Sequence, residues 1–388
     1  MNPYRILLIA LILCNYSVAQ ENKSTVTEIN LSGFYDSSHH WYDINDQEKI
    51  ITPVKNQPRY KRNDVTSIAD NILLFQKDNG GWAKNYDVLA ILTDKQKEIL
   101  RKDKSVFNTT FDNGATYNHA EYLAKAFFIT GEEKYKAGFL KGLDFILAAQ
   151  YPNGGWPQFY PDTSGYQKYI TFNDGAMIGI MKFLQNIVNR NDEYLNLDDK
   201  YYQKLKAAFS KGIDCILNCQ IYENEKLTAW CQQHDHITFK PRNARTYELA
   251  SICNMESAEI VEFLMSIDNP DERTINSINS AVKWFEDSKI FGIKVETVQA
   301  EPTEYIYHST NIDKVVVEDP SAPPIWTRFY ELGTHRPLFS NRDGIKVYSL
   351  DKVERERRTG YAWYTYSPQI ILDKYNDWLL KINSSHQQ

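Results

Sequence analysis

The stretch Leu143-Asp144-Phe145-Ile146-Leu147-Ala148-Ala149-Gln150, followed by Tyr151-Pro152-Asn153-Gly154-Gly155-Trp156, decides the fold, because relatives of it recur along the chain. The relatives are residues 68–76 with Gly80-Gly81-Trp82, residues 213–220 with Trp230 after a longer loop, and a weaker copy at 282–286. The glutamines that end the first three copies, at 76, 150 and 220, lie 74 and 70 residues apart. Self-similarity at a nearly fixed period indicates stacked supersecondary units.

Each period contains two amphipathic helices. Apolar residues recur with a 3.6-residue spacing at Ala120, Leu123, Ala124 and Phe127, and again at Phe139, Leu143, Ile146 and Leu147. Gly131 is typical of a helix end. Two helices per unit and about three units predict an all-α fold, an (α/α)3 toroid of helix pairs with long loops and a few short β-strands that wall a groove. An open superhelix with the same neighbours is the alternative.

Two related loops precede apolar helical patterns. Residues 110–116 read Thr-Phe-Asp-Asn-Gly-Ala-Thr, and residues 171–177 read Thr-Phe-Asn-Asp-Gly-Ala-Met. Taken alone, either loop fits ordinary helix capping. Because the two loops fall at equivalent places in successive repeats, we expect them to share one rim and to bring two carboxylates and two carboxamide oxygens together. Oxygen-only ligands of this kind suit a hard divalent cation, above all calcium.

Length and composition predict a globular protein, with 388 residues, 42% hydrophobic and 24% charged. The net charge of −6 gives no indication of binding to nucleic acid or to an anionic membrane. We expect a polar, aperiodic N-terminal strap at 20–60 and a single catalytic toroid domain at 61–388. The protein is expected to be a monomer.

The first 19 residues have the pattern of a secretory signal peptide. Arg5 precedes an apolar run at 6–13, and small residues lead to a cleavage site after about Ala19. The run is too short to span a bilayer, so no membrane insertion is expected. A secreted or periplasmic protein is predicted, with a lipoprotein anchored through Cys14 as the alternative.

The last third of the chain is rich in arginine. Nine of the fourteen arginines follow position 240, and a locally basic site on an acidic protein suits an anion. We expect the run of Arg355, Arg357 and Arg358 to be a solvated surface. His234 and Asp235 are either a metal or catalytic pair or a structural hydrogen bond.

An ordered set of motifs resembles the family-10 pectate lyases over about residues 60–370. The motifs are the 111–116 loop, the Gly-Gly-Trp loops, Trp230 to Asp235, residues 244–248 and residues 326–330. The resemblance implies a secreted toroid of three helix pairs that cleaves de-esterified polygalacturonate by calcium-dependent β-elimination. It implies Asp112, Asn113 and Asp174 as the calcium-site residues and Arg245 as the catalytic residue. The second substrate arginine stays open between Arg328 and Arg342.

The chemistry of β-elimination calls for these residue types. A base removes the C5 proton beside the uronate carboxylate, the C4 oxygen leaves, and a 4,5-unsaturated oligogalacturonide results. Calcium and arginines neutralise the charge that develops on the carboxylate. A guanidinium is an awkward base, so Arg245 would have to be poised by other cations such as Arg242 or calcium, and Lys84 is the alternative base. The expected substrate-binding residues are Arg328, Arg342, Lys84, Trp82, Trp156, His234 and Tyr247.

Two other classes of function remain open from the sequence. A glycoside hydrolase or another uronate lyase on the same toroid is one, with Asp112 and Asp174 as the acid and base of the hydrolase. A non-catalytic protein that binds oligogalacturonides on the Trp82 and Trp156 rings is the other. Only a lyase makes a C4–C5 double bond, which absorbs ultraviolet light.

Overall fold

The computed structural model describes residues 28–44, 49–194 and 197–385. The predicted signal peptide, including Cys14 and Ala19, lies outside the described residues. Within the described residues, every helix is too short or too polar to cross a lipid bilayer.

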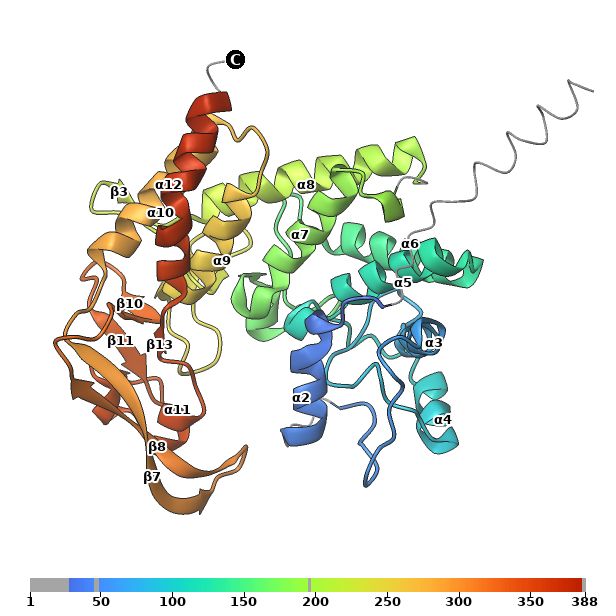
Figure 1. Ribbon diagram of the computed structural model, residues 1–388, viewed down its shortest axis with the longest axis horizontal. Coiled ribbons are helices and arrows are strands. Elements are labelled where there is room, and N and C mark those ends of the chain that lie inside the picture. The colour runs from blue at the N-terminus through green and yellow to red at the C-terminus, as the bar shows by residue number, and fades with distance from the viewer. Residues whose placement is uncertain (1–27, 45–48, 195–196, 386–388) are drawn as a thin grey trace, which may run out of the picture.

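Three helix pairs form the body of the molecule. They are α5 (Tyr117–Thr130) with α6 (Glu133–Ala149), α7 (Ala176–Val188) with α8 (Asp199–Cys219), and α9 (Asn254–Met265) with α10 (Glu272–Asp287). The first helices of the pairs pack in sequence, α5 on α7 and α7 on α9, while α3 (Val65–Phe75) covers α5 and α12 (Ser367–Ser385) covers α9. The pairs follow one another around an arc (Figure 1). The predicted all-α toroid of three helix pairs is confirmed.

The repeated glutamines join successive units. Each donates two hydrogen bonds through Nε2, one to a carbonyl in the loop that follows its own helix and one to a carbonyl on the outer helix of the next unit. The pairs of acceptors are Gly80 and Gly138 for Gln76, Gly154 and Ala208 for Gln150, and Thr228 and Ser277 for Gln220. The period of the sequence therefore reflects a bond that recurs at each unit boundary.

The repeated tryptophans are anchors in the core. The indole Nε1 of Trp82, Trp156 and Trp230 donates to the carbonyl of Ile72, Ile146 and Ile216, respectively, at 2.7–2.9 Å. All three side chains are fully buried. The prediction that Trp82 and Trp156 are sugar-binding platforms is therefore wrong, because neither ring has a face open to a ligand. The indole Nε1 of Trp326 donates in the same way to the carbonyl of Phe285, in the last turn of α10, at 2.8 Å.

The glycines before these tryptophans allow a loop to touch a helix. Gly80 and Gly154 both have φ of +93°. A Cβ at these positions would lie 2.3 Å from the carbonyl oxygen of Lys141 and 2.0 Å from that of Lys211, each on the next outer helix. Glycine is needed there for the approach of one backbone to another, and not for contact with a ligand.

Most strands are short and lie on the side of the last helix pair. A four-stranded antiparallel sheet has the order β12 (Lys346–Val347), β11 (Pro337–Ser340), β10 (Phe329–Glu331) and β6 (Ser251–Cys253), with Phe329 opposite Cys253. A second sheet has the order β1 (Ile170–Thr171), β4 (Gln233–His234) and β5 (Pro241–Arg242), and the pairs β2 (Tyr222–Glu223) with β3 (Lys226–Leu227) and β9 (Trp326–Thr327) with β13 (Tyr364–Thr365) are separate. The strands β7 (Ile293–Glu304) and β8 (Ser309–Glu318) form a long hairpin that the sequence analysis did not predict.

The N-terminal strap contains a helix. The segment α2 (Tyr35–Asp43) buries Trp41, whose Nε1 donates to the carbonyl of Ile51 at 2.7 Å. Phe34 also joins the main hydrophobic core, packing edge to face on His119 of α5. The described part of the segment predicted as a strap therefore contributes Phe34 and Trp41 to the core, and it contains a helix where no periodicity was expected. In Figure 1, α2 and the β7–β8 hairpin lie on opposite sides of the open end of the arc.

Candidate active site

Two equivalent turns precede α5 and α7. The turn η3 (Asp112–Gly114) has Asn113 at φ 50° and ψ 36°, and the turn η5 (Asn173–Gly175) has Asp174 at φ 51° and ψ 31°. Asp112 therefore occupies the position of Asn173, and Asn113 that of Asp174. The two turns pack against each other, as expected from their places in the repeat. No side chain caps either helix through a hydrogen bond at its N-cap, so the carboxylates are not explained by helix capping.

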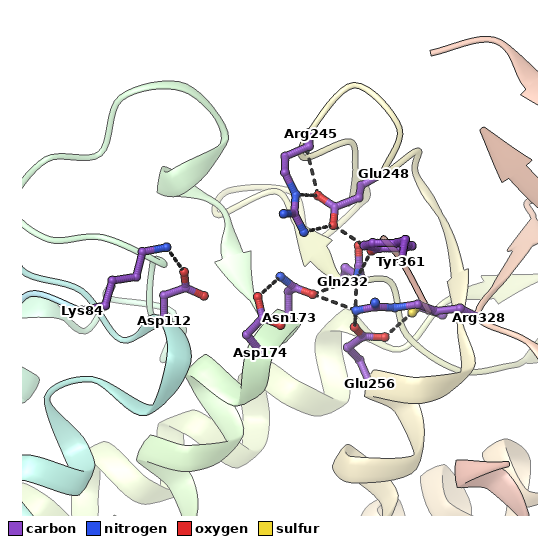
Figure 2. A network of polar contacts seen from close by, with 11 residues as sticks. Lys84, Asp112, Asn173, Asp174, Gln232, Arg245, Glu248, Glu256, Arg328 and Tyr361 are labelled. Carbon is purple, nitrogen blue, oxygen red and sulfur yellow. Dashed lines mark hydrogen bonds and ion pairs between the residues drawn. The ribbon is translucent and has the colours of Figure 1, made fainter. Parts of the chain in front are cut away.

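Asp112 is a buried carboxylate whose charged hydrogen-bond partner is Lys84. Its Oδ2 accepts from Nζ of Lys84 at 2.5 Å (Figure 2). Its Oδ1 is buried and, among the described residues, has no hydrogen-bond partner. Burial opposes the charged form, but the Lys84 ammonium outweighs burial and lowers the pKa of Asp112 below its usual value. The unpartnered oxygen is costly unless a donor or cation meets it.

Asp174 lies in the adjacent turn and is exposed to solvent, although much protein surrounds its carboxylate. Its Oδ2 accepts from Nδ2 of Asn173 at 2.6 Å. Enclosure by the protein, and then repulsion by the charge of Asp112, raise the pKa of Asp174 to about 7. Asn113, the third predicted ligand, donates through Nδ2 to Oδ1 of Asn85 at 3.3 Å.

These donors fit a hard divalent cation. Two adjacent carboxylates, one with an unpartnered oxygen and one with a raised pKa, are both stabilised by a positive charge between them. In the part of the chain that the structure describes, no group of three or more His, Cys, Asp or Glu side chains is arranged so that it could hold a metal ion by itself. The protein therefore offers only part of the six to eight oxygens that calcium prefers, and water or a ligand would supply the remainder.

A buried network supports the second turn. Oδ1 of Asn173 accepts from Nε2 of Gln232 at 2.8 Å and from Nη2 of Arg328 at 3.0 Å. Both donors also reach Oε1 of Glu256, on the first turn of α9 (Figure 2). Arg328 is only 4% exposed, and its guanidinium lies 4.7 Å from the ring of Tyr361. Arg328 is thus held under the turn, where it orients Asn173.

Arg245 stands opposite the two turns with its guanidinium fixed by a carboxylate. Nε and Nη2 donate to Glu248 at 2.8 and 2.5 Å, and the hydroxyl of Tyr361 donates to the same carboxylate at 2.8 Å. Glu248 is 2% exposed, whereas the Arg245 side chain is 43% exposed. Burial lowers the pKa of Arg245, but the ion pair with Glu248 outweighs this and raises it above the usual value. The positive charge of Arg245 stabilises the carboxylates of both Asp112 and Asp174.

The neighbouring Trp230–Asp235 string is structural. His234 is fully buried, with Nε2 accepting from the Cys231 amide at 2.9 Å and Nδ1 donating to the Phe239 carbonyl at 2.7 Å. Burial lowers the pKa of His234 to about 4, so the ring is neutral. The prediction that His234 binds substrate is wrong, because both ring nitrogens are occupied inside the protein. Asp235 accepts two hydrogen bonds from Arg242 at 3.0 and 2.8 Å, so Arg242 is neutralised there.

A groove of about 700 Å³ adjoins Arg245. Its lining includes Tyr247, Tyr307, Arg342 and Arg357, with His40 of α2 on the strap. Arg342 is 38% exposed and is fixed by two bonds to Glu356 at 2.9 and 2.8 Å. Tyr247 is 3% exposed and lies 5.1 Å from the guanidinium carbon of Arg245, so it supports the arginines more than it faces the groove. Of the two arginines left open, Arg342 is therefore the one at the groove surface.

The prediction that Arg355, Arg357 and Arg358 form a solvated surface is wrong, because these side chains are bonded to other parts of the protein. Arg357 is 5% exposed and pairs with Glu356. Arg358 makes two bonds to Asp313 on β8 at 2.7 and 2.6 Å, and Arg355 donates to carbonyls of both hairpin strands. The run fastens the β7–β8 hairpin to α11 (Arg355–Thr359).

Four residues of the site were not predicted from the sequence: Gln232, Glu248, Glu256 and Tyr361. Gln232 and Glu248 lay inside quoted motifs. Glu248 could have been found there, because an acid three residues after Arg245 is a natural partner for its guanidinium. Glu256 gave no signal, since an acid in the first turn of a helix is typical of any exposed helix. The four cysteines at 215, 219, 231 and 253 are buried and free.

Paired acidic turns face fixed arginines at this end of the toroid of helix pairs, an arrangement that suits an anionic ligand bound together with a cation. A profile of the pectic acid lyase family matches residues 76–372, and the chain belongs to this family. Two solved structures are similar. One is an aspartate-to-alanine mutant of the family 10 polysaccharide lyase from Cellvibrio cellulosa in complex with trigalacturonic acid (30% identity, 81% of this chain and 92% of that chain, TM-score 0.68). The other is the family 10 polysaccharide lyase from Cellvibrio cellulosa (28% identity, 91% of this chain and 99% of that chain, TM-score 0.68). No curated protein matches the chain. The protein is therefore a lyase of polysaccharide degradation.

Proposed function

We propose that the protein is a secreted pectate lyase that cleaves de-esterified polygalacturonate by calcium-assisted β-elimination and releases 4,5-unsaturated oligogalacturonides. The observation that carries the proposal is the unpartnered Oδ1 of Asp112 beside Asp174, with Arg245 opposite. The trigalacturonic acid bound by the similar Cellvibrio lyase supports an oligogalacturonide substrate.

Asp112, Asn113 and Asp174 are the residues that would hold calcium. When bound, calcium would neutralise the substrate carboxylate and so make the C5 proton more acidic. Lys84 already occupies one oxygen of Asp112, which keeps this carboxylate ionised and ready to act as a ligand. The substrate carboxylate and water would complete the coordination.

The arginines bind and orient the uronate. Arg342, at the groove wall, has Nη1 free of the two bonds to Glu356 that use Nε and Nη2, and can meet a carboxylate. Arg245 is directed by Glu248 in the same manner. Arg328 acts beneath them by holding Asn173 in place. Fixed cations of this kind stabilise charge that develops in the transition state without reorganising.

Arg245 is the proposed catalytic residue. In the elimination, the C5–H electrons become the C4–C5 double bond and the C4–O bond breaks, while the proton passes to the base. The ion pair with Glu248 opposes deprotonation of Arg245, so its action as the base requires an alkaline medium and the nearby cations. Lys84, on the other side of the two turns, is the alternative proton acceptor.

Secretion rests on residues 1–19, with Cys14 lipidation as the alternative. We propose a monomer that acts on polygalacturonate outside the cytoplasm.

The test is to incubate the mature protein with polygalacturonate, with calcium and with excess chelator, and to follow ultraviolet absorbance. We expect absorbance to rise with calcium, to stop with chelator and to resume when calcium is restored. Reducing ends without absorbance would establish a hydrolase, and binding without shortening would establish a binding protein. Full activity in excess chelator would disprove the calcium site.

A further inference from the structure

The β7–β8 hairpin occupies a loop that is short in the other repeats. The tryptophan follows the residue whose carbonyl accepts its indole hydrogen bond by 10 residues in the pairs Ile72–Trp82 and Ile146–Trp156. In the pair Phe285–Trp326 it follows by 41 residues. The hairpin lies within this longer segment. The segment from Phe285 to Trp326 therefore keeps the indole hydrogen bond of the other repeats and contains the β7–β8 hairpin in addition.

The hairpin is fixed to α11 by hydrogen bonds and ion pairs. Arg358 pairs with Asp313 of β8 at 2.7 and 2.6 Å, and Arg355 reaches carbonyls on both strands. His308, at the end of the turn, lies 3.7 Å from Glu356 and packs where a Cβ on Gly360 would meet it at 2.7 Å. The tip is thus held against the α11 segment beside the groove.

The tip presents an aromatic ring to the groove. Tyr307 is 49% exposed, and its ring centroid is 4.6 Å from the guanidinium carbon of Arg342. Tyr307 and Arg342 line both the groove next to Arg245 and a second hollow of about 390 Å³ beyond it. This pair therefore lies at the boundary between the two hollows.

We propose that Tyr307 is a stacking platform for a galacturonate residue outside the site of cleavage, so that the hairpin selects longer polygalacturonate chains. This inference rests on the proposed function. An aromatic ring offers a flat apolar face to the C–H side of a pyranose, and the Arg342 guanidinium that lies over one face of the Tyr307 ring holds the ring in place. The platform predicted from the sequence at Trp82 and Trp156 is thus provided by a different residue.

The test compares chain lengths. In Tyr307→Ala, we expect KM to rise about 3- to 10-fold for hexagalacturonate and polygalacturonate, with kcat unchanged, because a stacking ring binds ground state and transition state alike. KM for trigalacturonate should not change, since a trimer in the catalytic groove does not need the additional position. Tyr307→Phe keeps the ring and should behave like the parent.

The matched control is Phe291→Ala. Phe291 is 68% exposed and precedes β7 at the other end of the hairpin, away from both hollows. This variant should have parental KM for every chain length. Binding of hexagalacturonate to Tyr307→Ala placed in an Arg245→Lys background, measured by calorimetry, gives a second readout without turnover.

The outcomes separate the two proposals. If the parent does not produce the ultraviolet-absorbing product, the proposed function fails before any variant is considered. If the parent cleaves but Tyr307→Ala affects trimer and polymer equally, or affects neither, the platform is overturned. A Tyr307→Phe variant as weak as Tyr307→Ala would likewise overturn stacking in favour of a role for the hydroxyl.

Discussion

The carboxylate of Glu248 accepts both Nε and Nη2 of Arg245, at 2.8 and 2.5 Å, while the outer part of the guanidinium stays exposed. This two-point pair fixes the plane of the guanidinium and stabilises its charge. A residue so held is well placed to bind an anion, and it can accept a proton only when its pKa is brought down. The pair therefore determines how the role of Arg245 can be tested.

Arg245→Lys should lower kcat far more than a conservative substitution usually does. Lysine keeps the charge but loses the planar fork that Glu248 orients. If Arg245 is the base, we expect a loss of about 10²–10⁴-fold in kcat with little change in KM. A variant with near-parental kcat and raised KM would instead make Arg245 a binding residue and would direct attention to Lys84.

Glu248→Gln tests the same assignment through pH. Removal of the carboxylate favours the neutral guanidinium, so the pKa of Arg245 falls. A base is active when deprotonated, so the rising limb of the pH–kcat profile should move to lower pH. A rising limb that stays in place, in a variant whose melting temperature matches the parent, would contradict proton transfer to Arg245.

Asp174→Ala should remove the response to calcium without unfolding the protein. Asp174 is exposed to solvent and carries little core packing. In the parent, calcium at 100 times its Kd should stabilise the fold by about 2.7 kcal/mol, which calorimetric melting with and without calcium would detect. The variant should melt near the parental temperature in chelator and shift little with calcium. A calcium shift as large as the parent's would exclude Asp174 as a ligand.

Trp156→Ala should destabilise the fold and leave KM unchanged in the fraction that remains folded. The indole is fully buried and bonded to the Ile146 carbonyl, and loss of a buried tryptophan side chain costs about 3–5 kcal/mol. Urea unfolding followed by steady-state kinetics below the transition measures both quantities. A raised KM at parental stability would restore the role as a sugar platform.

We expect the His234→Gln variant to be less stable than the parent near neutral pH, and we expect this difference in the free energy of unfolding to become smaller as pH falls. The folded pKa of His234, about 4, is below the unfolded value near 6.5. Between these values only the unfolded state binds the proton, so this histidine reduces the parent's stability as pH falls through the window. The variant has no histidine to protonate at this position. The difference in the free energy of unfolding between parent and variant should therefore shrink by up to about 3 kcal/mol, at 1.36 kcal/mol per pH unit.

The comparison between variant and parent is required because other groups act in the opposite sense. Asp174 and Glu259 have pKa values raised to about 7, so their protonation stabilises the fold as pH falls. Urea unfolding of both proteins at several pH values from 4 to 8 provides the difference. A constant difference across this range would show that His234 titrates alike in both states.

The helices could be predicted from the sequence because their signals are local. Gln76, Gln150 and Gln220 each end an apolar run, and the same bond recurs at each unit boundary. The acidic turns could also be placed, since Asp112 and Asp174 each precede a helix of the repeat.

The predictions that failed depended on tertiary context. A Gly-Gly-Trp loop fits an exposed platform and a buried anchor equally well, and only the carbonyl of Ile146 distinguishes them. Glu256 meets Arg328 from a position 72 residues away, which no local pattern reveals. The hairpin was hidden because its aromatic tip, including Tyr307, carries no repeat signal.

In each connecting segment, the bond from the indole to the end of the preceding helix brings the two ends of the segment together. The length of the segment can therefore change with little effect on the stability of the core. Closure entropy grows only with the logarithm of length, at about 0.6 kcal/mol per doubling. The step from 10 residues before Trp156 to 41 before Trp326 is about two doublings, or about 1.2 kcal/mol. An insertion in one connecting segment can therefore add a new wall to the groove. It lowers the stability of the fold far less than the loss of a tryptophan anchor would.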